Sequence, residues 1–406
     1  MAIAQGISKK VVVKAQTGLG VAASGTGGQI LRRESSTNKL TIASFENNEL
    51  VSHQQSTGKT HGSRTVDVGL NGVLSPGTYS KLIASITRKA FVATTALTGL
   101  ALVFGGTAGA YTITGTGLLV TGGFKVGDVV RVTAGTSLPA DILNKNLLIT
   151  GLTATVMSVR TINGSTITTG VTSYAACTIS LNGKKTIVPI TGHTKEYWTV
   201  EDWQEDIALS EVFTDVVMGK VDIALASTGN ATIGLTAVGL NRTRGTTQVL
   251  TTPTAETTAL PLSSVNGILM VAGSPIANVT SVNISIDGKA ASMGAVVGSV
   301  VSPDVQRGTV SVTGSFTAFY QDGSLQTVFE GNSAISLVAV VQSDDTESSA
   351  FVTFNMSYIT IDSDDKDDGD KGIIRTYNFT ARINPNGGPA LANDNTIISI
   401  QDSAAA

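Results

Sequence analysis

Alternating apolar and polar residues run through most of the chain, and two stretches repeat this alternation in the same way. Residues 65–74 place Val66, Val68 and Leu70 on one face, and residues 309–318 do the same with Val310 and Val312. Side chains of an extended strand point alternately to its two sides, so each stretch predicts a strand with one buried face.

A turn and a helical pattern follow each of these strands. The apolar residues that share one helical face are Leu82, Ile83 and Ile86 in the first copy and Leu325, Val328 and Phe329 in the second. Ser75 suits the N-cap of the first helix and Pro76 its first turn. Each copy therefore predicts a strand, a turn and a short amphipathic helix.

The repetition continues further along the chain. Residues 213–218, followed by Val221 and Ile223, have the same spacings as residues 351–356, followed by Ile359 and Ile361. A third predicted strand follows in both copies, at residues 235–241 and 379–384. Three matches in the same order predict two tandem modules of one fold.

Composition supports a mostly β protein. The chain is rich in Gly, Thr, Ser and Val, and only 14% of its residues are charged. The formal charge is −3, so the composition does not indicate a basic surface that would bind nucleic acid. The single cysteine, Cys177, allows no disulfide framework within the chain and is expected to be buried and inert.

No membrane segment is expected. Lys9 and Lys10 precede only three valines, which is too short an apolar run for a secretory signal. The most apolar region, residues 96–120, is interrupted repeatedly by Gly and Thr and makes a poor membrane span.

With 406 residues, the chain should form more than one domain. The predicted organisation is a first module (1–91 and 195–245), an inserted domain (92–194), a linker (246–278) and a second module with a C-terminal tail (279–406). The insertion shows a short strand about every ten residues, separated by Gly and Asn turns, which predicts a small β-barrel or sandwich that projects outward.

Three further segments of the chain have specific predictions. Residues 1–37 form either a flexible arm or an arm that becomes ordered against a neighbouring subunit. Residues 46–64 read as a long polar hairpin loop. In the tail, Ile397, Ile398 and Ile400 predict an edge strand.

Candidate chemistry is sparse. The acidic stretch 362–370 fails the EF-hand pattern, because Lys366 and Arg375 occupy positions that need oxygen ligands. His53, His61 and His193 have no metal-ligand spacing, and the glycine clusters at 18–20 and 25–28 lack the Lys-Ser/Thr of a phosphate-binding loop. We therefore predict no metal, no cofactor and no enzymatic activity, and favour a structural protein.

Several short motifs resemble the opening of the major tail proteins of siphophages, which are long-tailed bacteriophages. They are Gly27-Gly28-Gln29-Ile30-Leu31-Arg32-Arg33, Asn48-Glu49, His53-Gln54-Gln55 and Gly72-Val73-Leu74-Ser75-Pro76-Gly77-Thr78-Tyr79. The resemblance implies a tail tube protein, with two tandem tail-tube-type β-sandwich modules, each with one helix. Sheets of such modules join around a ring, and stacked rings form a tube that conducts the genome.

The resemblance also implies a subunit number. The family pattern is one module per chain and six modules per ring, so two modules per chain imply three chains and pseudo-sixfold symmetry. If each module lends about four strands, ~24 strands at ~4.8 Å spacing and ~40° tilt give a cylinder roughly 45–50 Å across. A DNA duplex could pass through the remaining pore.

Two sets of residues are assigned to this assembly as hypotheses. The lumen-facing set is Asp67, Asn71, Thr214, Lys220, Asp222, Ser311, Thr313, Ser315, Asn378, Thr380 and Arg382. The set joining successive rings is Arg32, Arg33, Glu46, Asn48, Glu49, His53, Gln54, Gln55, Asp364, Asp365, Asp367 and Asp368. The lumen-facing side chains are mostly small, polar or mixed in sign, which would let a duplex slide.

The implied partners are further copies of this chain, a tape-measure protein and DNA in the lumen, and tail tip and tail terminator proteins, with no membrane. The implied location is the virion tail, after assembly in the host cytoplasm. Two alternatives remain open: a hexameric tube protein with one module as outer decoration, and a surface adhesin or carbohydrate-binding β protein.

Overall fold

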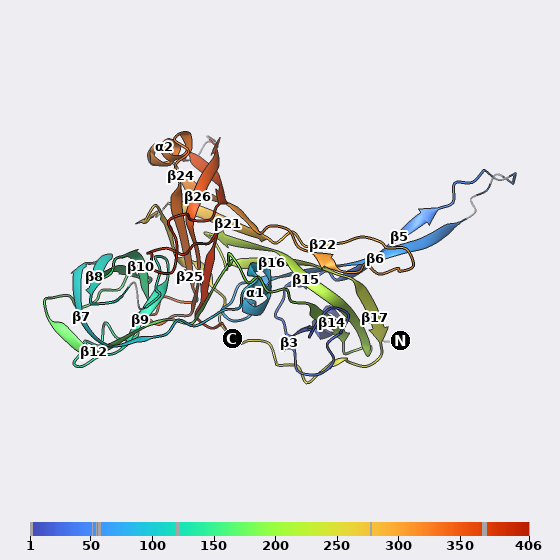
Figure 1. Cartoon of the computed structure of the whole chain (residues 1–406), viewed down its shortest axis with the longest axis horizontal. Helices are drawn as coiled ribbons and strands as arrows, with labels where there is room; N and C mark the ends of the chain where they lie inside the picture. Colours follow the sequence, from blue (N-terminus) through green and yellow to red (C-terminus); the bar gives the residue numbers. More distant parts are fainter. Residues whose placement is uncertain are drawn as a thin grey trace.

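The chain folds into long antiparallel strands with two short helices among its described residues (Figure 1). The computed structural model describes residues 3–50, 52–53, 55, 58–118, 122–276, 278–367 and 372–405. It confirms the predicted fold class: mostly β, with a small closed β-barrel.

A first unit of the fold contains two sheets that share one long strand. One sheet consists of β1 (Lys9–Ala15), β14 (Trp198–Gln204), the first half of β15 (Leu209–Ala226) and β17 (Asn241–Gly245). The other consists of β5 (Lys39–Glu46), β6 (Lys59–Val73), β16 (Thr232–Gly239) and the second half of β15. The 18-residue β15 thus belongs to both sheets.

A second unit repeats this pairing order. One of its sheets consists of β19 (Ser263–Val271), β25 (Ile335–Gln342), the first half of β26 (Phe351–Asp367) and β28 (Ser399–Asp402). The other consists of β21 (Val279–Asp287), β24 (Ser311–Phe319), β27 (Ile374–Ala381) and the second half of β26. The repeats around Val68 and Val312 therefore lie on corresponding strands, β6 and β24.

The two units join edge to edge. β15 pairs antiparallel with β21, with Ile223 opposite Ile284. This pairing produces one continuous run of strands in the order β5-β6-β16-β15-β21-β24-β27-β26. One hydrophobic core extends beneath both units, from Val66 and Val68 to Val312 and Phe354.

The barrel occupies the insertion and has a core of its own. Its strands are β7 (Leu97–Thr107), β8 (Ala110–Thr114), β9 (Val129–Ala134), β10 (Leu147–Leu152), β11 (Val156–Thr161) and β12 (Ser173–Leu181), closed in the order β10-β11-β8-β7-β12-β9. Phe104, Phe124 and Cys177 are buried inside it. Cys177 is buried as predicted, and burial raises the pKa of its thiol.

The barrel also packs against the second unit. Val129, Leu148 and Ile162 of the barrel share a buried cluster with Val340 and Phe351. The Gln401 side chain donates to the Val129 carbonyl and accepts from the Val129 N–H, both at 2.8 Å. A domain inserted in the first unit is therefore held by the second, on the left in Figure 1.

The first helix begins later than predicted. α1 (Ser80–Thr87) starts after Tyr79, and Ser75 bonds through its hydroxyl to Thr78 at 2.7 Å instead of capping the helix. The apolar face of α1 is buried, whereas Leu325, Val328 and Phe329 of α2 (Ser324–Glu330) are only partly buried. The proposed N-cap at Ser75 was wrong because residues 75–78 form a separate turn.

Residues 9–15, 25–26, 29–30 and 35–36 pair with other strands of the same chain, so the expectation of a flexible arm was wrong for these strands. β1 pairs along its whole length with β14, which buries Val11, Val12 and Val13. β3 (Gln29–Ile30) extends the sheet beyond β1, and β2 (Gly25–Thr26) pairs in parallel with β18 (Leu250–Thr251).

Other segments also differ from expectation. β28 lies between β26 and β13 (Lys184–Ile187), so the predicted edge strand is internal. The hairpin loop is shorter than 46–64, because β6 begins at Lys59. The remaining short elements are η1 (Gly6–Ser8), β4 (Ser35–Ser36), β20 (Ser274–Pro275), β22 (Ala291–Ser292) and β23 (Val305–Gln306).

Candidate functional site

A polar hollow of about 680 Å³ lies on the face of the continuous sheet that points away from the core. It crosses both units, since β6, β16, β15, β21, β24, β27 and β26 all contribute to it. Six of the predicted lumen-facing residues line it: Asn71, Asp222, Thr313, Ser315, Asn378 and Thr380.

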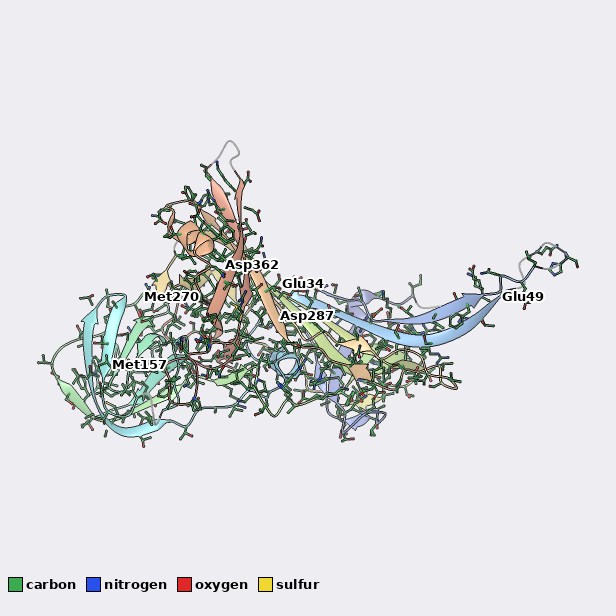
Figure 2. All side chains as sticks on the ribbon, turned by 45° about the horizontal axis from the view of Figure 1, so that its top comes forward. Glu34, Glu49, Met157, Met270, Asp287 and Asp362 are labelled. Atoms are coloured by element: carbon green, nitrogen blue, oxygen red, sulfur yellow. The ribbon has the colours of Figure 1, made fainter. Side chains whose placement is uncertain are left out.

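Strand alternation accounts for this polarity. On β21, Ile284 and Ile286 are buried in the core, and the intervening Ser285 faces the hollow. Asn283, Ser285, Glu34 and Asp362 also line the hollow and were not predicted. The alternation of residues 279–287 carried the signal for Asn283 and Ser285. Figure 2 shows Glu34 and Asp362 in the middle of the molecule, near Asp287.

Both lysines beside the hollow are paired with aspartates, whereas Glu34 and Asp362 in its lining have no ion-pair partner among the described residues. Lys220 lies 2.9 Å from Asp222 on the same strand, and Lys39 lies 3.5 Å from Asp67. All four side chains are at least two-fifths exposed, so each pair contributes little to stability. The surface thus presents both signs of charge together with small hydroxyl and amide groups.

The remaining predicted lumen residues have different positions. Asp67, Lys220 and Ser311 lie on β6, β15 and β24, just beyond the residues that line the hollow. Thr214 is in the first half of β15, opposite Asn241 of β17, and is not in the hollow. Arg382 is exposed one residue past the end of β27.

The continuous sheet ends in two edges without partner strands in the described part of the chain. Residues 360–364 of β26 pair only with β27. At the other end, β4 and β5 pair only with β6. Unpaired backbone N–H and C=O groups at such edges are ready to bond another strand.

Residues assigned to ring stacking are found in three places. The Arg32 guanidinium donates to the Ala259 carbonyl at 2.5 Å, and the Arg33 guanidinium donates to the Lys9 carbonyl. Both arginines therefore form hydrogen bonds within their own chain. The exposed residues at the end of the β5–β6 hairpin are Glu46, Asn48, Glu49, His53 and Gln55, with Glu49 far from the body in Figure 2. Gln54 lies outside the described residues.

The acidic residues assigned to stacking are at the far end of β26. Asp364 is ion-paired with Arg375, and Asp365 and Asp367 are exposed. Asp368 lies outside the described residues.

Among the residues that the structure describes, no group of three or more His, Cys, Asp or Glu side chains is arranged to hold a metal ion. None of the described helices has the length and apolar character needed to cross a bilayer.

A mostly β chain with two open sheet edges can pair with further copies of itself, as self-assembling structural proteins do. The family model described as phage tail tube protein matches residues 6–381, and the chain belongs to this family. No curated protein matches the chain. The protein is thus a structural protein of a bacteriophage tail that assembles with itself into a tube, which confirms the resemblance at the level of the tail tube.

Proposed function

We propose that this protein forms the tail tube of a siphovirus-like phage as stacked rings of three chains, with the polar sheet face lining a channel for DNA. The observation that carries the proposal is the internal junction between β15 and β21, which joins two similarly paired units into one sheet. A duplicated unit would need the same junction again between neighbouring chains.

The internal junction provides a template for the external one. Counting along equivalent strands, β26 corresponds to β15, and residues 34–38 correspond to the part of β21 that pairs with β15. In the internal junction Asp222, which also pairs with Gly234 of β16, lies opposite Ser285. Ser363 has the equivalent place on β26, opposite Asn378 of β27, and Thr37 has the place of Ser285. The equivalent pair between chains is therefore Ser363 of one copy and Thr37 of the next.

Ring closure also agrees with the strand count. Each chain supplies the eight strands of the continuous sheet, so three chains would close ~24 strands into a ring, and no sheet edge would stay open. The six equivalent junctions would then alternate between bonds within a chain and bonds between chains.

The channel surface suits a sliding polyanion. Tight binding of DNA requires rows of Lys and Arg that neutralise phosphates. Around the hollow, Lys220 and Lys39 are instead each paired with an aspartate. Passage of DNA past a tape-measure protein, and contacts with tail tip and terminator proteins, complete the proposal.

A double-cysteine variant tests the junction. Partner residues of antiparallel strands have Cα atoms ~4.5–5.5 Å apart, which a disulfide can span. Thr37→Cys/Ser363→Cys tubes, once oxidised, should therefore give covalent dimers and trimers on a denaturing gel that revert to monomers on reduction. The native Cys177 is buried in the barrel and does not interfere.

The controls are the two single variants, Thr37→Cys and Ser363→Cys, which should give no ladder. Covalent species larger than a trimer, or a true sixfold ring of single chains in electron micrographs of the tubes, would contradict the trimer. That second result would favour the hexameric alternative with one module outside the ring.

A further inference from the structure

A second hollow, which we call the basic pocket, lies at one end of the second unit's sheet. It measures about 490 Å³ and is lined by Arg88, His193, Arg307, Val188, Pro189, Ile190, Val310 and Ile383, among others. Ile190 and Ile383 are more than half exposed, so the pocket presents apolar surface together with positive charge.

The two arginines have no carboxylate within salt-bridge distance among the described residues. The Arg88 guanidinium donates to the Gly288 carbonyl at 3.2 Å and to that of Gly308, and Arg307 donates to the Thr194 carbonyl at 2.6 Å. Arg88 Nε is buried without a hydrogen-bond partner.

The surroundings neutralise this charge only in part. Burial lowers the pKa of both guanidiniums, and the Arg88 charge lowers that of Arg307 further, whereas Asp304 and Glu196 raise it. Asp304 is itself bound to Lys195 at 2.6 Å, and burial raises the pKa of Glu196 although the Arg307 charge lowers it. A pocket of this kind fits an acidic segment that also carries apolar side chains.

Such a segment exists at the opposite end of the same sheet, and we call it the acidic tip. Its exposed apolar residues are Phe319, Tyr320 and Ile373, each about two-fifths to one-half exposed. Asp364 and Asp365 lie beside them, and the described residues 362–367 contain four aspartates and one lysine. Arg375 is ion-paired with Asp364, whereas the exposed Asp365 accepts hydrogen bonds only from the uncharged side chains of Ser363 and Asn378. The charge of Asp365 is therefore available to a cationic partner.

The strands themselves separate the two surfaces. β24 runs from Ser311, next to Val310 of the basic pocket, to Phe319 of the acidic tip. Nine residues at ~3.3 Å each span roughly 30 Å. β27 returns from the tip to the pocket, and Figure 1 shows the tip of this sheet beside α2 at the top of the molecule.

We propose that the acidic tip of one chain enters the basic pocket of a second copy in the next ring, an inference that rests on the proposed tube function. Different surfaces at opposite ends make a head-to-tail contact, which repeats without closing and so extends a tube. Arg307 and Arg88 would face Asp365, while Phe319 and Ile373 would cover Ile190 and Ile383.

Charge reversal at each end, and then at both, tests the contact. Arg307→Glu and Asp365→Lys should each raise the protein concentration needed for tube growth about tenfold or more, since each places like charges together. The double variant Arg307→Glu/Asp365→Lys restores an opposite pair between neighbouring copies, and tubes should recover. Tube length is measured by negative-stain microscopy and sedimentation.

Controls separate this inference from the proposed function. Arg160→Glu, a reversal on β11 of the barrel, should leave assembly unchanged, and circular dichroism establishes that every variant is folded. Wild-type tubes together with unaffected Arg307→Glu tubes would overturn the inference alone, as would a double variant that fails to recover. A wild-type chain that forms neither rings nor tubes would overturn the proposed function itself.

Discussion

At the residue scale, buried charges connect parts of the chain that are distant in sequence. Lys185 lies 2.8 Å from Asp128 of the barrel and 3.1 Å from Asp394 of the C-terminal segment. Lys125 donates to three carbonyls of that segment, including Gly388 at 2.6 Å. Removing one partner of such a group leaves a buried charge unpaired and strongly destabilises a fold.

Asp402 gives a prediction at this scale. It accepts bonds from the N–H groups of Gly77 and Ala404, yet burial raises its pKa to about 6 from 3.8. Between these values the folded state holds a proton that the unfolded state has lost. The contribution to stability is therefore complete below about pH 4 and is lost as the pH rises to about 6, by about 3 kcal/mol at most.

Urea denaturation of wild type and Asp402→Asn at several pH values between 4 and 7 checks this. The stability of wild type relative to the variant should decline across that range. The exposed Asp345→Asn serves as the control and should show no such trend relative to wild type. A difference between wild type and Asp402→Asn that stays constant with pH would show that Asp402 titrates normally.

At the element scale, turns and bends decide where the strands and helices lie. Gly77 has a φ of +74°, and the turn that contains it separates β6 from α1. A Cβ at Gly77 would come within 2.6 Å of the Ala404 carbonyl oxygen. The turn is thus shaped by the C-terminal segment, more than 300 residues away, which is why the helix start at Ser75 was predicted wrongly.

Gly77→Ala should therefore lower the unfolding free energy by more than the strain of a left-handed backbone accounts for. Gly20 has nearly the same φ, +76°, but open space around it. We expect Gly20→Ala to lose about 1 kcal/mol of unfolding free energy and Gly77→Ala about 3 kcal/mol, the excess coming from the backbone clash. Equal losses in chemical denaturation would mean that the C-terminal segment moves aside freely.

At the scale of the whole molecule, the two units depend on each other. They share one core, β21 bonds to β15, and β28 of the second unit bonds to β13, which leads out of the barrel. The barrel, inserted in the first unit, is packed on the second. We therefore expect the two units to fold cooperatively and not as independent domains joined by a linker.

A fragment ending at residue 278 should for this reason not fold on its own. It would expose the β15 edge and the apolar side chains that now meet Ile284, Ile286 and Val312. We expect it to aggregate or to lack near-ultraviolet circular dichroism, while co-expression with residues 279–406 restores a soluble complex. A monomeric, ordered fragment would contradict the shared core.

Much of the local structure could be predicted from the chain. The period-two pattern placed β6, β24, β15 and β26, and it placed six of the residues that line the hollow, because a strand with one buried face leaves its alternate residues on the other. The repeated spacings indicated two similar units. Asp362 and Glu34 were missed, since only the folded sheet brings them beside the strands at its centre.

The alternation and the duplicated spacings are local, and so the sequence alone determined the strands, their buried faces and the family to which this tube protein belongs. Only the tertiary structure decided that the strands within residues 9–36 pair with other strands of their own chain, that the barrel is held by the second unit, and that β28 lies inside a sheet. Each of these depends on pairing between distant segments, where several strands offer equivalent edges and the packing of the complete core selects among them.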